Sequence, residues 1–386
     1  MSVRVEVKPQ LLDWARARSG IDDESWVRRF PKFDEWRSGA SKPTSKQLQE
    51  FARKTYTPVG AFFLDTPPEE PLPIADFRTI PGHDLVGGNG TLSANLLDTI
   101  YVCQRRQEWF RENQLFNREP PVRLVGLAKV SDAVEVAAEQ LRSLLTWTSE
   151  VRNETAGSGG AVAELRDRAE AAGVLVMISG FVGSNTRRVL ELEEFRGFAL
   201  SDPYAPLVFV NGADAKAAQL FTLAHELAHI LLGVTGVSDA EPAELAPLGT
   251  ERWCNRVAAE FLVPVAELRT WLGSEVPRSQ VDRLASKFRV SRQVIVIRMR
   301  DIGVLDARDV QEMLAAEQAR FAGESVAKVS GGNYYNNKPQ QVSRRFAKAL
   351  ISSAFEGVTP YTRAFRMLDV RKEATFNRLA ETVGVR

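Results

Sequence analysis

The chain has 386 residues and a formal net charge of +1, with 44% hydrophobic and 26% charged residues. This length predicts two or three domains, and the composition is that of an ordinary soluble globular protein. The balanced charge excludes a strong overall attraction to nucleic acid or to membranes, although local basic patches stay possible. Residues 1–6 lack the apolar core of a signal peptide, and no run is long enough to span a bilayer. We therefore expect no membrane partner. The two cysteines are isolated and form no CxxC pair, which predicts a reducing cytoplasm and argues against a cysteine-bound zinc.

Short helices are predicted for the first part of the chain, residues 9–64. Apolar residues recur there at helical spacing, and Pro43-Thr44 is a helix start signal. Residues 65–91 are rich in proline and glycine, which indicates an extended linker. We therefore expect a small helical domain at residues 1–64 and a linker at residues 65–91.

Helices and a few strands are predicted for the rest of the chain. Helices are expected at residues 92–114, 131–146 and 161–172, with a break at 157–160. Strands are expected at 174–179, 195–200 and 207–210. A helix from near Ala215, a loop from Gly233 to Gly249 and a helix at 250–262 follow, and residues 279–386 are mostly helical with a polar break at 331–339. The fold class is therefore α+β and predominantly helical, with one domain at 92–270 and a helical C-terminal domain at 271–386.

The most informative stretch is residues 225–229, His-Glu-Leu-Ala-His, which holds two of the three histidines in the chain. On a helix, residues four apart share a face, so both imidazoles point to the same place. The glutamate after the first histidine can reach a water on a bound metal and act as its general base. A buried apolar helix that merely contains polar residues is the alternative. It fits badly, because desolvated imidazoles and a desolvated carboxylate need strong partners. We therefore predict a metal site at His225 and His229, with Glu226 as the base.

A catalytic zinc site needs a third protein ligand and keeps a fourth position for water. The remaining histidine, His83, lies far upstream in the linker. Leu232 and Thr235 stand where the metzincin pattern requires glycine and histidine, which excludes that subclass. A downstream carboxylate is therefore expected, and the candidates are Glu241, Glu244, Glu251 and Glu260.

Helix phase favours Glu251 over Glu260. On the predicted helix, Glu251 shares a stripe with Asn255 and Ala258, flanked by further small residues, whereas Glu260 lies about 180° away. If the small-residue stripe packs on the helix of residues 225–229, Glu251 points at the metal. The alternative is that Glu251 is a solvated acid in the first turn of a helix, where the helix dipole favours it.

Two segments resemble the ImmA/IrrE family of zinc metallopeptidases. Residues 221–229, Phe-Thr-Leu-Ala-His-Glu-Leu-Ala-His, are similar to the core motif of that family. Residues 251–264 resemble its second motif, with Cys254 and Val257 where alanine and phenylalanine are usual. The resemblance covers residues 160–270. It implies a zincin-like core, zinc held by His225, His229 and Glu251, and Glu226 as the catalytic base.

Helix-turn-helix resemblance is found at both ends of the chain. Residues 9–64 resemble a degenerate Xre-type helix-turn-helix, although the interval from Trp26 to Trp36 is too short for a normal turn plus recognition helix. Residues 73–79 resemble a segment of such fusions. Residues 284–298 have helix-turn-helix-like spacing, which any small three-helix core shares. DNA is therefore a possible partner.

Two functions follow as hypotheses. The first is a cytoplasmic zinc endopeptidase that cleaves a regulatory protein, for which the resemblance implies a repressor or an antitoxin-like substrate in stress, phage or toxin–antitoxin regulation. The second is an antitoxin-like binding protein for a toxin or for DNA, whose zinc is structural or dormant. A purely DNA-binding repressor is disfavoured by the balanced charge.

Overall fold

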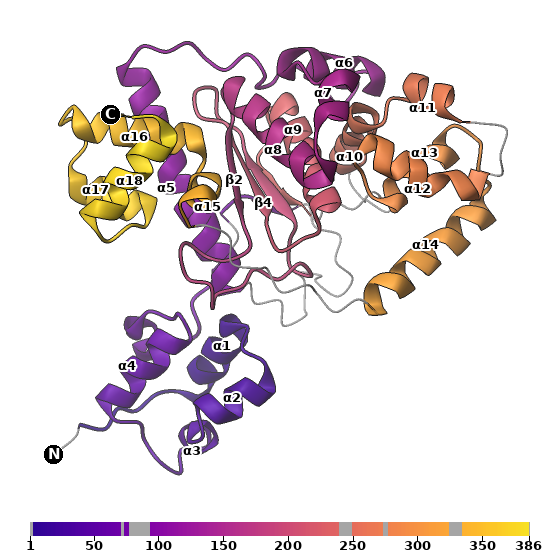
Figure 1. Cartoon of the computed structure of the whole chain (residues 1–386). Coiled ribbons are helices and arrows are strands. Elements are labelled where there is room, and N and C mark those ends of the chain that lie inside the picture. Colours follow the sequence, from indigo (N-terminus) through magenta and orange to yellow (C-terminus); the bar gives the residue numbers. More distant parts are fainter. Residues whose placement is uncertain are drawn as a thin grey trace. The chain divides into compact units, whose positions relative to one another are not determined.

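The computed structural model describes residues 3–70, 73–76, 93–238, 249–272, 277–323 and 334–385 (Figure 1). Several sequence predictions fall outside these residues, namely His83, Glu241, Glu244, residues 331–333 and most of the linker. These residues form two compact units: the first holds those up to residue 73 together with 93–101, and the second holds 74–76 and those from 102 onward. Each unit is described by itself below.

The first unit is a small helical domain with an aromatic core. Its elements are α1 (Pro9–Ser19), α2 (Asp23–Arg29), α3 (Phe33–Ser38), α4 (Ser45–Lys54), a 3-10 turn η1 (Val59–Phe63) and the start of α5 (Ala94–Phe116). Thr44 and Gln47 form a capping box that fixes the start of α4. Rings of α2, α3, α4 and η1 meet around Phe51, whose centroid lies 5.0 Å from that of Phe30 and 5.5 Å from that of Phe62. This aromatic packing gives a short chain segment a sizeable core.

The second unit is built on a mixed five-stranded sheet with the order β1-β5-β3-β4-β2. The strands are β1 (Ala75–Asp76), β2 (Leu175–Ser179), β3 (Gly197–Leu200), β4 (Leu207–Asn211) and β5 (Gly236–Ser238). β3 runs antiparallel to both of its neighbours, whereas the pairs β2–β4 and β1–β5 are parallel. The edge strand β1 pairs with β5 through only two residues, Ala75 opposite Gly236 and Asp76 opposite Val237.

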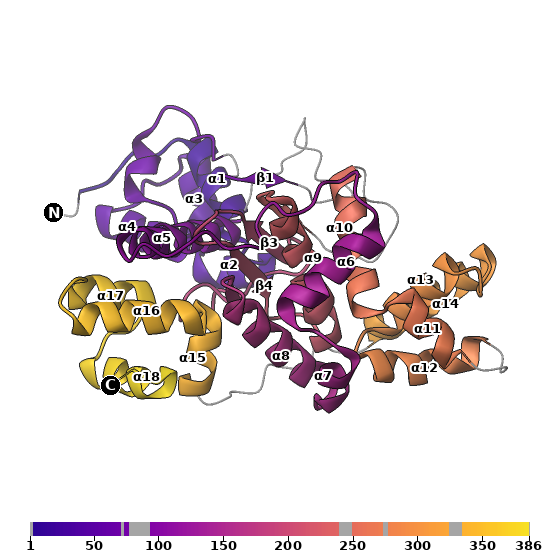
Figure 2. The same ribbon diagram turned by 90° about the horizontal axis from the view of Figure 1, so that it is seen from above.

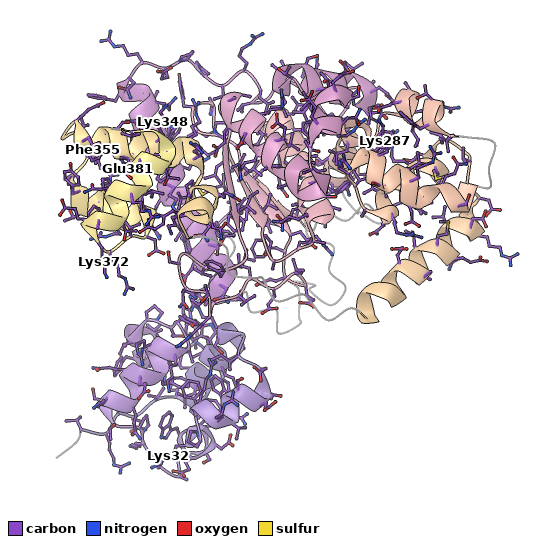
Figure 3. The ribbon with its side chains drawn as sticks, in the orientation of Figure 1. Lys32, Lys287, Lys348, Phe355, Lys372 and Glu381 are labelled. Carbon is purple, nitrogen blue, oxygen red and sulfur yellow. The ribbon has the colours of Figure 1, made fainter. Side chains whose placement is uncertain are left out.

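Helices form the main core with this sheet. They are α6 (Val134–Leu145), α7 (Ser149–Glu154), α8 (Gly157–Ala171), α9 (Lys216–Leu232), α10 (Gly249–Leu262), α11 (Val265–Trp271), α12 (Pro277–Phe288), α13 (Arg292–Asp301) and α14 (Ala307–Gly323). Helices α8 and α9 pack directly on one face of this sheet, and the other helices of the main core extend outward from them. Figure 2 shows α9 between the strands and α10. Lys287 of α12 lies with its ammonium 4.2 Å from the ring centre of Trp271 in α11 (Figure 3). Apolar residues of α6, α8, α9, α10, α12 and α13 belong to one continuous core with the sheet.

The two faces of the sheet follow the period-two alternation of a strand. Val208 and Val210 of β4 join the core under α9, whereas Phe209 stacks on Phe198 on the opposite face, 5.0 Å between ring centres. On that face Arg106 of α5 approaches Met177 of β2. The sheet is therefore buried on both sides.

Four further helices follow, α15 (Tyr334–Val342), α16 (Arg344–Phe355), α17 (Tyr361–Leu368) and α18 (Glu373–Val383). Glu170 of α8 joins them to the sheet domain, because its carboxylate accepts from the Ser343 hydroxyl at 2.6 Å and from the Arg344 amide at 3.0 Å. The Arg344 amide lies at the start of α16, where the helix dipole favours the negative charge of the Glu170 carboxylate. The domain boundaries expected from the sequence remain a prediction.

The predicted fold class, α+β and predominantly helical, is confirmed. Three local predictions were wrong. Residues 157–160 form the first turn of α8 instead of a break, residues 236–238 of the expected loop form strand β5, and residues 334–339 belong to helix α15 with Pro339 inside it. In each case packing against the sheet domain outweighs weak local propensity. Within the described ranges, no helix is both long and apolar enough to cross a bilayer.

Candidate metal centre

Helix α9 carries the histidine motif through the middle of the second unit. Every residue from Gln219 to Leu231 is buried, because the sheet packs on one side of α9 while α8 and α10 pack on others. The helix ends at Gly233, whose φ of 73° is left-handed and whose amide returns to the carbonyl of Ile230. His225, Glu226 and His229 are 0% exposed.

Small residues on β3 let α9 approach the sheet closely. A Cβ atom at Gly197 would lie 2.7 Å from Cγ2 of Thr222 and 2.8 Å from Oε1 of Glu226. Ala199, the next residue on the same face, is also small and buried. Gly197 therefore leaves the space that the Glu226 carboxylate occupies.

Helix α10 supplies the third side chain. Glu251 stands in its first turn, is 2% exposed and points toward α9. Its Oε2 lies 3.1 Å from Nε2 of His225, and its Oε1 lies 2.9 Å from Nε2 of His229. The two Nε2 atoms are 3.0 Å apart. Three possible ligand atoms thus converge inside the protein, and among the described residues this is the group that can hold a metal ion.

The donor set fits a zinc ion. Two imidazole nitrogens and one carboxylate are the ligands of a common class of catalytic zinc sites, and bonds of 2.0–2.1 Å at tetrahedral angles separate ligand atoms by about 3.4 Å. The spacings of 2.9–3.1 Å are close to that value. Two imidazole nitrogens only 3.0 Å apart also need a proton or a cation between them.

The electrostatics of the site favour a ligating carboxylate. Burial alone would raise the pKa of Glu251, but the hydrogen bonds and charges of the two histidines lower it to about 2. Burial lowers the pKa of His229 and outweighs Glu251, which favours the neutral ligand form of that imidazole. Burial would also lower the pKa of His225, but Glu251, Glu226 and Asn255 raise it. The charge of Glu251 therefore persists over the physiological pH range.

Cys254 lies on the same helix but stays outside this donor set. Burial, together with the charges of Glu251 and Glu226, raises the pKa of its thiol well above the usual value. A neutral thiol is a poor metal ligand.

The Glu226 carboxylate lies between α9 and the strands β3 and β5. The Ser238 hydroxyl at the end of β5 donates to its Oε1. Ser238 is 0% exposed and stands opposite Gly197 in the β3–β5 ladder. The carboxylate therefore lies over a serine and a glycine that face each other on neighbouring strands.

Glu260, the alternative ligand, lies away from the three converging side chains. Arg298 of α13 donates to its Oε2, and the Val265 amide donates to its Oε1 at 3.3 Å. Both members of the ion pair are buried. The structure thus brings His225, His229 and Glu251 together and engages Glu260 elsewhere.

Sequence reasoning missed Ser238 and Gly197. Ser238 lies in a stretch that resembles a polar loop, and a three-residue strand has no measurable periodicity. A glycine inside the strand-like run 195–200 was a usable signal, because such a glycine often marks close approach of another element.

Comparison with known families agrees with this geometry. Residues 169–300 match the family described as the IrrE N-terminal-like domain (Peptidase_M78), and residues 342–382 match a domain of unknown function, DUF8813. No curated protein matches the chain. The first match spans α9 and α10 and supports the resemblance to the ImmA/IrrE family for this part of the chain. Residues 169–300 are therefore similar to the IrrE N-terminal-like domain, whose family model is named for a peptidase.

Proposed function

We propose that this chain is a zinc-dependent endopeptidase in which His225, His229 and Glu251 hold the metal and Glu226 is the general base. The observation that carries this proposal is the convergence of the two Nε2 atoms, 3.0 Å apart, on the Glu251 carboxylate, whose two oxygens lie 2.9 and 3.1 Å from them. The match of residues 169–300 to a metallopeptidase family supports it.

The proposed reaction is hydrolysis of a peptide bond. Zinc, when bound, lowers the pKa of a coordinated water and polarises the scissile carbonyl. Glu226 takes a proton from the attacking water and passes it to the leaving amine. The side chains of His225, Glu226, His229 and Glu251 are at most 2% exposed. Their low-dielectric surroundings strengthen the electrostatic interactions of the proposed reaction.

The proposed substrate is a regulatory protein in the cytoplasm, such as a repressor or an antitoxin-like protein, in stress, phage or toxin–antitoxin regulation. DNA reading by the first unit is a weaker proposal. Its helix α3 has six residues, and Asp34 and Glu35 lie in the first turn, where a phosphate would otherwise be favoured.

Replacing Glu226 by Gln tests the proposal. The zinc-loaded parent and Glu226→Gln chains are incubated with the products of the genes on either side of the chain's own gene. Fluorescein-labelled casein serves as a generic unfolded probe. We expect the parent to cut at least one of these proteins, and the variant to keep its zinc and lose cutting at least a hundred-fold. Equal cutting by both chains contradicts the assignment of Glu226.

A second candidate function is an antitoxin-like binding protein with a structural or dormant zinc. The complete burial of His225, Glu226 and His229 favours it, because a substrate backbone must reach these groups. A toxin-neutralisation assay distinguishes the two candidate functions. It compares the parent with a His225→Ala/Glu226→Gln chain against a toxin that is encoded next to the gene for this chain. Neutralisation equal to that of the parent supports the binding role.

A further inference from the structure

We propose that Ser238 is the positioning residue for the Glu226 carboxylate, and that Gly197 is the paired residue that leaves room for it. This inference rests on the proposed function, because it assigns a partner to the proposed general base. The structural basis is the hydrogen bond from the Ser238 hydroxyl to Oε1 of Glu226, inside the protein.

The backbone around Ser238 fixes its hydroxyl. Ser238 pairs with Gly197 across the antiparallel β3–β5 ladder, and its carbonyl accepts from the Arg196 amide at 3.3 Å. A hydroxyl on a paired strand has little freedom to follow a moving carboxylate. Ser238 therefore defines where Oε1 lies.

Gly197 of β3 leaves only enough room for the Glu226 carboxylate. The missing Cβ at Gly197 would lie 2.8 Å from Oε1 of Glu226, so any larger residue would push the carboxylate aside. With Oε1 held by Ser238 over Gly197, the plane of the carboxylate is set, and with it the position of Oε2. A general base must hold its proton-accepting oxygen within hydrogen-bond reach of the proton, and small displacements cost rate.

A serine that only satisfied the hydrogen-bonding needs of a buried carboxylate would affect stability and not the rate of turnover. Loss of such a bond lowers stability and leaves turnover per folded molecule unchanged. Loss of a positioning bond lowers kcat while KM and the metal content stay the same. A charge-assisted hydrogen bond of ordinary strength corresponds to a fall in kcat of about ten- to a hundred-fold.

The test compares the full-length parent with Ser238→Ala, Ser238→Thr, Glu226→Gln and the double variant Ser238→Ala/Glu226→Gln. Ser179→Ala is the matched control, because Ser179 also ends a buried strand and its hydroxyl bonds the Phe181 carbonyl, at 2.7 Å. Cleavage of fluorescein-labelled casein is measured with zinc loaded. We expect the kcat of Ser238→Ala to fall about ten- to a hundred-fold and Ser238→Thr to recover most of that loss. We expect the double variant to be no slower than Glu226→Gln alone. A Ser238→Ala chain with parental kcat overturns the proposal.

A second readout does not depend on turnover. Each chain is loaded with Co²⁺ in place of zinc, and its visible absorption spectrum is recorded. We expect Ser238→Ala to change the spectrum in the same sense as Glu226→Gln, while Ser238→Thr and Ser179→Ala match the parent. Identical spectra for Ser238→Ala and the parent, beside a changed Glu226→Gln spectrum, overturn the proposal. A parent that binds Co²⁺ but cuts no casein counts against the proposed activity, and the spectra alone then decide the role of Ser238.

Discussion

Arg298 of α13 donates to the Glu260 carboxylate of α10 inside the protein, where both side chains are only 7% exposed. This pair explains why one glutamate of α10 meets the histidines and the other does not. Glu251 stands in the first turn and faces α9, whereas Glu260 is held on the side of α10 that faces α13. Arg298 also donates to the Val263 carbonyl just after α10, at 3.1 Å, which ties α13 to the end of that helix.

Glu260→Gln is predicted to weaken the fold and to leave the metal site intact. Removing the carboxylate charge leaves the buried Arg298 with only the more exposed Asp301 carboxylate, 3.2 Å away, as a counter-ion, which costs roughly 2 kcal/mol of unfolding free energy. Chemical denaturation measures this loss, and metal analysis of the same sample measures zinc. A Glu260→Gln chain that keeps its stability but loses zinc would contradict the separation of roles on α10.

Gly197→Ala is predicted to destabilise the protein by about 1–3 kcal/mol, because the added methyl group overlaps Thr222, Glu226 and the carbonyl of Phe209. Gly159→Ala is the matched control. Gly159 lies inside helix α8, and its added Cβ would meet only Cγ of Lys216 at an ordinary 3.8 Å. We expect this control to be neutral or more stable by about 0.5–1 kcal/mol. Thermal denaturation of both variants checks the prediction, and equal stabilities would count against close packing of α9 on β3.

Lys338→Met is predicted to stabilise the protein. Burial, with a smaller contribution from Arg106, lowers the pKa of Lys338 to about 8 from its ordinary 10.5, although Asp369 opposes the shift. The unfolded chain therefore binds more protons than the folded chain between pH 8 and 10.5, and stability rises with pH across that window. Below pH 8 the buried charge carries its full cost, so the methionine variant gains roughly 2–3 kcal/mol at pH 7.

Urea denaturation at pH 7 and at pH 10 checks this prediction. The gain of Lys338→Met over the parent shrinks at pH 10, because the parent lysine is then mostly neutral when folded. The Lys338 ammonium donates to the Ser184 hydroxyl at 2.8 Å and lies 3.8 Å from Oδ2 of Asp369. A gain that is absent at pH 7, or equal at both pH values, would show that these two partners fully compensate the buried ammonium.

The parts of the fold with long periodic patterns were predictable from the sequence. The apolar periodicity of residues 216–232 and 250–262 gave helices α9 and α10, and the spacing of His225 and His229 placed both imidazoles on one face. Helix phase favoured Glu251 over Glu260 on the condition that the small-residue stripe packs on α9, and the ImmA/IrrE resemblance implied the same ligand. The roles of these residues in metal binding and catalysis stay a proposal.

The remaining features depend on contacts that local sequence does not encode. β1 and β5 have two and three residues, too few for a periodic signal; β5 forms on the edge of β3, and β1 in turn pairs with β5. The bond between Ser238 and Glu226 joins two elements whose approach depends on Gly197. The glycines at 157–160 were expected to break a helix, but packing of α8 against α9 sustains it.

The zinc content of the purified full-length chain and of its His225→Ala variant tests the central claim most directly. After loading and removal of excess metal, we expect about one zinc per parent chain and at least ten-fold weaker binding by the variant, since one of three protein ligands is missing. A correctly folded parent that binds no zinc, or a His225→Ala chain that binds it as tightly, would contradict the proposed metallopeptidase site.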